Sequence, residues 1–446
     1  MPPQPRLRGH FAFMKRIIFF ALVIFPFLSV YSLAEDSVCS ERRTKTATQR
    51  LAEGIAAGPE LKESLCGFCA VKVSGDTLLW FTPEKRLVPA SNMKLLTTGA
   101  ALLRLGGNFR YKTVFASEAA PADSVLEGNL YIIGGGDPLI GEIFPYLPSR
   151  ESTFGKWRKV LTGNGIKAIR GNIVAVGGYF GSERYHPDWS GEDLLSKDGV
   201  VPAGITWRGK MRDSIPDGPY AAALHFLEYL SADSSFCIEG QALEGIADSL
   251  CKDSLLVLGE VPSEPLRSLT ATANGQSDNF VAETLLKTLG KSISGSDDYP
   301  SSVKALHKAL APLGLMAASG SMRFADGSGL SRKNYISPSF MVRYLLAMEH
   351  SRAGREFCAS LPFAGEKRTT LEKRLPKAPY ALRSRVRMKS GSMNGVCCLS
   401  GYILAGNGKP SDTIAFSLMV NNAVAGNKAV FALLDKIIES LADENK

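Results

Sequence analysis

Hydrophobic positions recur at helical spacing just after Pro89. The repeat is formed by Met93, Leu96, Ala100 and Leu103. It predicts a helix that begins at Ser91 and ends at Gly106-Gly107, because glycine pairs favour helix ends. A second helix is predicted from Asn279 to Leu289, and a final amphipathic helix from about Lys428 to Leu441.

Alternating and continuous apolar segments predict strands at both ends of the chain. Residues Cys69 to Ser74 and Thr77 to Phe81 should form a hairpin, because the intervening Gly75-Asp76 is a favoured tight-turn pair. Further strands are expected at Val386–Ser390, Val396–Leu404 and Thr413–Val420. Cys397 and Cys398 are adjacent in one of them and should face opposite sides of the sheet.

The pattern changes between about Tyr111 and Pro265. Short strand candidates such as Leu130–Ile133 and Asn172–Val176 alternate there with glycine clusters. This is expected for a large, mainly β domain inserted into an α/β (α+β) domain. The predicted organisation is a signal peptide (1–34), the first part of a catalytic domain (35–110), an inserted domain (111–265) and the second part of the catalytic domain (266–446).

The N-terminus departs from the rest of the chain. Basic residues precede the apolar run Ile17 to Val30, and Ser32-Leu33-Ala34 offers small residues at the cleavage positions. These features indicate a secretory signal peptide, with a retained transmembrane anchor as the alternative. The sequence therefore predicts a periplasmic or otherwise extracytoplasmic protein with no membrane span after cleavage.

Composition narrows the function classes. The 446 residues are 45% hydrophobic and 21% charged, which is typical of a soluble globular protein. Removal of the signal segment, with its four basic residues, would lower the formal charge from +9 to +5. The sequence contains no basic patch interleaved with aromatic residues, so nucleic acid is not expected as a partner. The eight cysteines allow disulfides, but Cys66-x-x-Cys69 lacks a second ligand pair, so no metal site is expected.

Three short motifs carry the chemistry. The first is Ser-x-x-Lys, which occurs at Ser91, Ser249 and Ser301. Only Ser91 has apolar residues on both sides. A lysine one turn along a helix lies on the same face as the serine, so Lys94 can accept the proton of Ser91. Burial and a second nearby cation would favour the neutral form of that lysine.

The other two motifs supply polar groups for a substrate. Ser277 and Asn279 flank Asp278 near a helix start, where they could relay a proton and contact a substrate backbone; an ordinary helix cap is the alternative. Lys389-Ser390-Gly391 continues a strand, where a lysine can bind a carboxylate and glycine allows close pairing. An edge strand protected by charge is the alternative. The trio together is a signature of serine β-lactamases and penicillin-binding proteins.

Longer segments carry a family resemblance. They are Pro89 to Leu95, Ser277 to Glu283, Asp326 to Arg332, and Lys389 to Ser392 with Leu399 to Tyr402. From about residue 50 onward the chain resembles the D-alanyl-D-alanine carboxypeptidase/endopeptidase family of low-molecular-mass penicillin-binding proteins (peptidase family S13). The resemblance implies a serine β-lactamase/transpeptidase-like domain, split by an insertion after the Ser-x-x-Lys helix.

The resemblance also implies an activity. The expected enzyme is a serine-type D-Ala-D-Ala carboxypeptidase or DD-endopeptidase that acts on peptidoglycan stem peptides, is acylated by β-lactams and needs no cofactor. Ser91, Lys94 and Ser277 would be catalytic. The substrate would be bound by Asn279, Lys389, Ser390, Ser392 and Asp193. The alternatives are a β-lactamase or esterase on this fold and a non-catalytic wall-binding protein.

Three departures from the family pattern are visible in the sequence. Ser390 and Ser392 stand where threonines are usual, which keeps the hydroxyl groups. Arg368 precedes Thr369-Thr370-Leu371 where glycine is commoner before the Thr-Leu pair, so a nearby loop should differ. The insertion is also short, which suggests a reduced nested subdomain.

Overall fold

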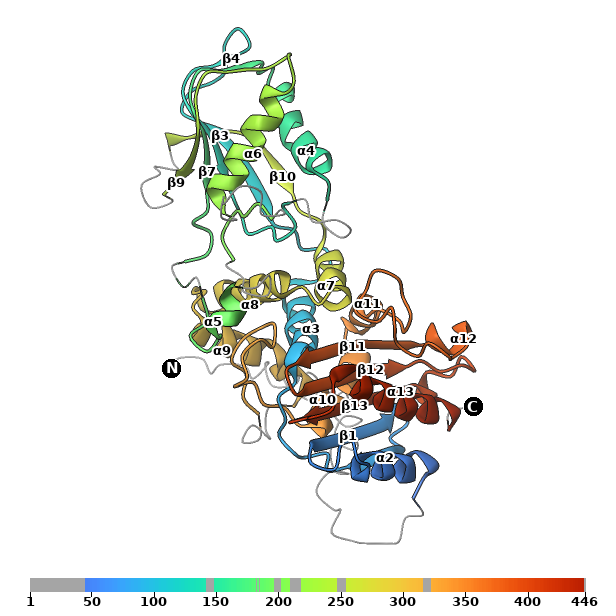
Figure 1. The fold of residues 1–446 in the computed structure, drawn as a ribbon. Coiled ribbons are helices and arrows are strands. Elements are labelled where there is room, and N and C mark those ends of the chain that lie inside the picture. The colour runs from blue at the N-terminus through green and yellow to red at the C-terminus, as the bar shows by residue number, and fades with distance from the viewer. Residues whose placement is uncertain are drawn as a thin grey trace, which may run out of the picture.

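The computed structural model describes residues 45–141, 148–181, 183, 185–195, 202–208, 218–246, 254–315 and 322–444. The predicted signal segment and Ser249 lie outside these residues. The described chain forms two five-stranded sheets and one three-stranded sheet. Figure 1 shows the two larger sheets at opposite ends of the molecule, with helices between them. None of the described helices is long and apolar enough to cross a membrane.

The first sheet joins the two ends of the described chain. Its strands are all antiparallel and run in the order β11 (Val386–Met393), β12 (Val396–Ile403), β13 (Ile414–Asn421), β1 (Leu65–Lys72) and β2 (Thr77–Phe81). The predicted N-terminal hairpin is β1–β2, and the three predicted C-terminal strands are β11 to β13. Because β1 pairs with β13, segments more than 300 residues apart share one sheet.

Helices cover both faces of this sheet, which explains why every residue of β12 and β13 is buried. On one face lie α2 (Ala47–Ala57) and α13 (Asn427–Asp443). On the other lies α10 (Pro338–Glu349), with α11 (Gly354–Ser360) in contact with it. The short helix α12 (Tyr380–Arg383) follows in the chain, and its Leu382 packs on the α2 and α13 side. Cys397 is buried among the apolar residues on the α2 and α13 side of the sheet, and Cys398 among those on the α10 side. The prediction that they face opposite sides is therefore confirmed. The six described cysteines, these two included, are free thiols.

The predicted helix after Pro89 lies at the centre of a helical group. A 3₁₀ turn, η2 (Ala90–Asn92), leads into α3 (Met93–Leu105), which packs against α7 (Leu266–Gly275), α8 (Asn279–Ser294) and α9 (Tyr299–Leu310). Residues 93 to 103 of α3 are all buried, although the sequence pattern predicts that only one face of this helix is apolar. This burial holds the start of α3 in a fixed position.

The second large sheet belongs to the middle of the chain. Its order is β10 (Leu256–Pro262), β3 (Lys112–Ser117), β5 (Leu130–Ile133), β7 (Ile173–Val176) and β9 (Ala242–Gly245), with the last three strands parallel. Two helices, α4 (Arg150–Gly163) and α6 (Pro219–Ser231), pack on it through aromatic residues such as Phe154, Trp157 and Phe226. The strands agree with the expected β-rich section, whereas these helices were not predicted.

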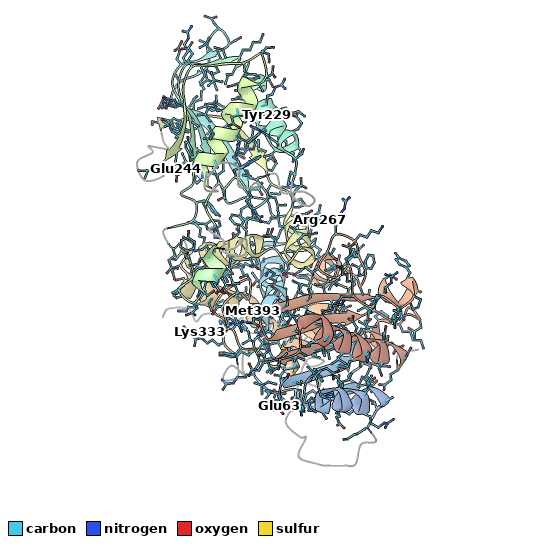
Figure 2. All side chains as sticks on the ribbon, viewed as in Figure 1. Glu63, Tyr229, Glu244, Arg267, Lys333 and Met393 are labelled. Atoms are coloured by element: carbon cyan, nitrogen blue, oxygen red, sulfur yellow. The ribbon has the colours of Figure 1, made fainter. Side chains whose placement is uncertain are left out.

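The middle section leaves and rejoins the rest of the chain at one place. Strands β3 and β10 are antiparallel neighbours, with Lys112 opposite Pro262. The small parallel sheet β4 (Val125–Leu126), β6 (Ala168–Ile169) and β8 (Cys237–Ile238) lies at its far end. In Figure 2, Tyr229 and Glu244 lie in this part and Met393 and Glu63 in the other. The chain thus enters and leaves the middle section through two neighbouring strands. This arrangement supports our proposal that residues 111–265 are an inserted domain.

Candidate active site

Ser91 lies in a tight, constrained turn. It is the central residue of η2, and the preceding Ala90 has a φ of 46°, in the left-handed region that is rare outside glycine. Backbone strain of this kind concentrates at functional sites. Asn92 is buried and donates its amide hydrogen to Ser400 Oγ at 2.7 Å, which ties the turn to β12.

Two glycines allow the neighbouring segments to approach this turn. A Cβ at Gly391 of β11 would lie 3.1 Å from the backbone nitrogen of Ser91 and 2.6 Å from the carbonyl oxygen of Pro89. A Cβ at Gly329 would lie 1.9 Å from the carbonyl oxygen of Ala90. Larger residues would therefore push the strand and the loop away from Ser91. The glycine of the Lys-Ser-Gly motif therefore allows the Ser91 turn to approach the strand, whereas the sequence predicted that it would allow close pairing with a substrate.

Lys94 is fully buried and points at Ser91. Its Nζ lies 2.9 Å from Ser91 Oγ, 2.6 Å from Asn279 Oδ1 and 2.8 Å from the carbonyl oxygen of Ser328. The first two motifs are thus brought together within hydrogen-bond distance, although 185 residues separate Lys94 from Asn279. The geometry suits transfer of the serine proton to the lysine.

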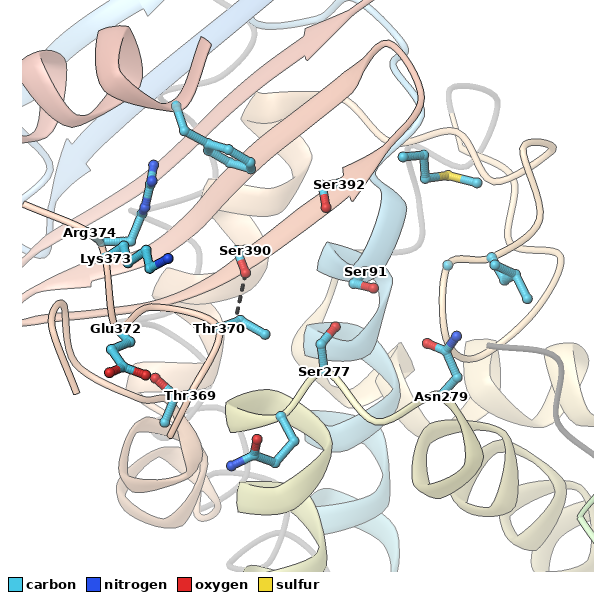
Figure 3. Close-up of a pocket in the computed structure, with 15 residues that line it drawn as sticks. Ser91, Ser277, Asn279, Thr369, Thr370, Glu372, Lys373, Arg374, Ser390 and Ser392 are labelled. Carbon is cyan, nitrogen blue, oxygen red and sulfur yellow. Dashed lines mark hydrogen bonds between the residues drawn. The ribbon is translucent and has the colours of Figure 1, made fainter. Parts of the chain in front are cut away.

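The loop between α7 and α8 and the first residue of α8 present Ser277 and Asn279 to the same place. Ser277 has a φ of 59°, and both side chains line the cavity in front of Ser91 (Figure 3). Asp278 caps α8 by accepting the backbone N–H of Val281 at 3.0 Å, and it also pairs with Arg208 at 2.9 Å. The structure therefore assigns the cap to Asp278 and leaves its two neighbours facing the cavity.

The third motif is split between the surface of the cavity and the interior. Ser390 and Ser392 line the cavity, whereas Lys389 is fully buried and is not among the described residues that line it. Lys389 Nζ lies 2.6 Å from the carbonyl oxygen of Ser390. Burial, together with the nearby charge of Lys94, holds the pKa of Lys389 well below its usual range.

The loop Asp326 to Arg332, for which the sequence predicted no role, supports Lys94. Asp326 is buried and accepts the backbone N–H groups of Gly329 and Ser331 at 2.8 and 2.6 Å. Glu283 of α8 accepts the N–H of Ser328 at 2.7 Å, and the carbonyl of that same Ser328 contacts Lys94. Burial, and next the charge of Asp326, raise the pKa of Glu283. In the sequence, Glu283 is an acid among the apolar residues of a helix and the last residue of the segment Ser277 to Glu283 that carries the family resemblance.

The segment around Asp193 contacts this loop from the middle section. Trp189 Nε1 donates to Asp326 Oδ2 at 2.9 Å, and His186 Nε2 lies 2.9 Å from the carbonyl oxygen of Ala325. Asp193, in the short helix α5 (Gly191–Leu195), accepts the hydroxyl of Ser190 at 2.7 Å. It is not among the described residues that line the cavity in front of Ser91.

The cavity itself has a volume of about 580 Å³ and is large enough for a peptide segment. Ser91, Ser277, Asn279, Ser390 and Ser392 share its wall. Figure 3 shows the serines of all three motifs, Ser91, Ser277, Ser390 and Ser392, around one space. The arrangement can hold a carbonyl at Ser91 and surround it with hydroxyl and amide groups.

Comparisons with known proteins identify the arrangement. The model of the D-Ala-D-Ala carboxypeptidase 3 (S13) family matches residues 47–211 and 245–442. A D-alanyl-D-alanine carboxypeptidase of Actinomadura sp. (strain R39) is 27% identical over 523 residues, covering 99% of this chain and 93% of that protein.

Solved structures share the fold. Penicillin binding protein 4 (dacB) from Haemophilus influenzae superposes with a TM-score of 0.71 at 20% identity, covering 89% of this chain and 99% of that one. The predatory peptidoglycan endopeptidase Bd3459 from Bdellovibrio bacteriovorus superposes with a TM-score of 0.56 at 17% identity, covering 86% of this chain and 93% of that one. The predicted transpeptidase-like α/β fold is thereby confirmed.

Proposed function

Since the chain belongs to the D-Ala-D-Ala carboxypeptidase 3 (S13) family, we propose that it cleaves D-alanyl bonds of peptidoglycan stem peptides through an acyl-enzyme on Ser91. The observation that carries the proposal is the 2.9 Å contact between buried Lys94 Nζ and Ser91 Oγ at the wall of a peptide-sized cavity. Because peptidoglycan lies outside the cytoplasmic membrane, we propose that the enzyme acts there, in agreement with the predicted signal segment.

The reaction follows from the positions of the side chains. Ser91 Oγ attacks the carbonyl carbon of the penultimate D-alanine while Lys94 accepts its proton. The backbone N–H groups of Ser91 and Ser392 face the developing oxyanion. The proton then passes through Lys94 and Ser277 to the leaving amine, the amide bond breaks, and water later hydrolyses the ester.

The remaining groups orient the substrate. Asn279, already in contact with Lys94, offers its amide to the substrate backbone. The hydroxyl of Ser392 is available for the terminal carboxylate, and that of Ser390 would have to turn from Thr370, to which it donates at 2.9 Å. Lys389 lies behind them as a buried base that can take up a proton when this anion arrives. Hydrogen bonds to a charged group contribute about 1.5–3 kcal/mol each. The expected contact between Asp193 and a cationic group of the stem peptide stays a prediction.

Labelling with penicillin tests the nucleophile. The strained β-lactam amide mimics the scissile bond, so penicillin should add covalently to Ser91, and Ser91→Ala should abolish the adduct in intact-mass spectra. Ser301→Ala is the matched control, because Ser301 also begins a Ser-x-x-Lys sequence but lies at the start of α9. Labelling that survives in Ser91→Ala would contradict the assignment.

The lifetime of the adduct separates a peptidase from a β-lactamase on this fold. Rapid deacylation requires a second base over the ester, and Lys94 is the one base that we assign to both half-reactions. We therefore expect an adduct that lasts minutes or longer, together with D-alanine release from purified muropeptides. Fast repeated turnover of penicillin without muropeptide cleavage would favour the β-lactamase.

A further inference from the structure

The second motif contacts the middle section of the chain as well as the cavity. Ser277 and Asn279 line the cavity (Figure 3), whereas Asp278 between them is buried. The carboxylate of Asp278 lies 2.9 Å from the guanidinium of Arg208, which belongs to the middle section. The chemistry proposed above does not involve Arg208, so this ion pair lacks an assigned role.

Both oxygens of the Asp278 carboxylate are engaged. Oδ1 accepts the backbone N–H of Val281 at 3.0 Å and caps α8, and Oδ2 accepts a hydrogen bond from Arg208 Nη2. The side chains of Asp278 and Arg208 are only 4% and 12% exposed. Removal of one partner from a buried ion pair leaves the charge of the other uncompensated. Asp278 therefore depends on Arg208 for its position and for the balance of its charge.

Arg208 is itself held by three further contacts. Its Nη1 donates to the carbonyl of Pro138 at 3.1 Å, and its backbone N–H donates to the carbonyl of Ile140 at 3.0 Å. The guanidinium also lies over the ring of Phe280, 4.7 Å from the ring centre. A planar guanidinium held at several points has little freedom left to lose when it binds a carboxylate. The middle section thus presents Arg208 to Asp278 in a fixed orientation.

Ser277 lies in a backbone conformation that needs such support. Its φ of 59° is in the left-handed region, which is unfavourable for a serine. Strain of this kind persists where the surrounding contacts hold the residue in place. On one side of Ser277, the carbonyl of Gly275 accepts the backbone N–H of Thr370 at 3.0 Å. On the other side Asp278 follows directly, and its side chain is held by Arg208.

We propose that Arg208 is a positioning residue of the reaction: through Asp278 it holds the hydroxyl of Ser277 where this hydroxyl can pass a proton to the leaving amine. The inference rests on the function proposed above. Arg208 is not among the described residues that line the cavity, so it acts without touching the substrate. Asn279 is held independently, because it begins α8 and contacts Lys94 at 2.6 Å. The middle section therefore takes part in acylation by way of Ser277.

A double-mutant comparison with Ser277 tests the proposal. Arg208→Met removes the guanidinium and should slow acylation by penicillin about tenfold or more, because Ser277 is then poorly placed. In a Ser277→Ala background the same substitution should change the acylation rate by less than about twofold, because no hydroxyl remains to be positioned. Arg208→Lys keeps the charge and should recover part of the lost rate.

Two further variants separate positioning from folding. Arg150→Met is the matched control, because Arg150 of the middle section also pairs with a carboxylate, Glu228 at 2.9 Å, and lies over an aromatic ring. It should leave the acylation rate essentially unchanged. Asp278→Asn keeps an oxygen for the helix cap but removes the charge that pairs with Arg208. It should slow acylation in the parent background and have little effect in Ser277→Ala.

The outcomes are distinct. Slower acylation in Arg208→Met, with little effect of the same substitution in Ser277→Ala, supports the positioning role. An equal factor in both backgrounds, or an unchanged rate in the folded variant, overturns it. If Arg208→Met does not fold, Asp278→Asn decides by the same comparison. If penicillin does not acylate the parent enzyme at Ser91, the proposed function itself fails, and this is seen before any variant is compared.

Discussion

At the scale of single residues, the two buried lysines define the protonation of the site. Lys94 Nζ faces three oxygen atoms, which suits a protonated amine, whereas burial and the charge of Lys94 lower the pKa of Lys389. Both lysines cannot easily be charged at once. A substrate carboxylate at Ser390 and Ser392 would favour a proton on Lys389, and Lys94 would then be free to act as the base.

Lys389→Met should therefore change the pH dependence of acylation. Without Lys389 no neighbouring cation disfavours protonation of Lys94, so the acid limb of the penicillin acylation rate should move to higher pH. A shift of one pH unit would lower the rate on that limb about tenfold. Stopped-flow measurements of penicillin acylation between pH 5 and 9 locate this acid limb. In Lys389→Arg the limb should stay at the pH at which the parent enzyme has it. An unmoved limb in Lys389→Met would show that Lys389 holds no proton in the reacting complex.

The sequence predicted which residue types form the site, but not how deeply each of them is buried. Alternation along a strand correctly separates Lys389 and Gly391, which are buried, from Ser390 and Ser392, which line the cavity. It cannot say which face of the strand meets solvent, because that depends on η2 packing against β11. The support from Glu283 was missed for a related reason, since its partners lie on a loop 44 and 45 residues further along the chain.

At the scale of elements, helices with a clear apolar repeat were predictable and those without it were not. The predicted helices correspond to α3, α8 and α13. In α4, by contrast, Phe154, Trp157 and Leu161 are buried among charged and small residues, and in α6 almost every residue is apolar. Their position is decided by the aromatic contacts that they make on the second sheet, which local pattern does not contain.

Helix α13 supplies a test of stability against pH. Burial raises the pKa of Asp435 from 3.8 to about 6, although nearby Arg374 opposes this. Between these values the native state holds a proton that the unfolded chain has released, so this residue makes the free energy of unfolding fall as pH rises from about 4 to 6. Asp435→Asn should remove that part of the dependence. Urea unfolding at pH 4, 5 and 6 measures it, and parallel curves for both proteins would contradict the prediction.

At the scale of the whole molecule, the middle section contacts the loop Asp326 to Arg332 that supports Lys94. Trp189 bonds to Asp326, and Asp188 pairs with Lys333 just beyond the same loop. The loop in turn provides the carbonyl of Ser328 to Lys94. Contacts made by the middle section therefore reach Lys94, the proposed base, through Asp326 and the peptide group between Ser328 and Gly329.

Trp189→Phe tests this coupling. Phenylalanine keeps most of the ring but removes one of the two donors to Asp326 Oδ2, since the backbone N–H of Ser331 still donates to that oxygen. The loss of one such hydrogen bond costs about 0.5–1.5 kcal/mol. We expect a lower melting temperature and a severalfold slower acylation by penicillin. Trp207→Phe is the control, because Trp207 stacks on Phe154 at 4.6 Å within the core of the middle section. It should lower stability with little change in acylation, and equal effects of both variants on acylation would count against the coupling.

The pairing of β3 with β10 has a consequence for how the chain folds. About 150 residues lie between the place where β3 leaves the proposed catalytic domain and the place where β10 returns to it. Bringing such distant segments together is slow because the entropy of the intervening chain is lost first. Once β3 and β10 have paired, Tyr111 and Ser263 are joined by a backbone hydrogen bond of 2.9 Å. The two ends of the middle section are then held together, so the section connects its neighbours as a short loop would. Early closure of the middle section would thus shorten the search by which α3 finds α7 and α8.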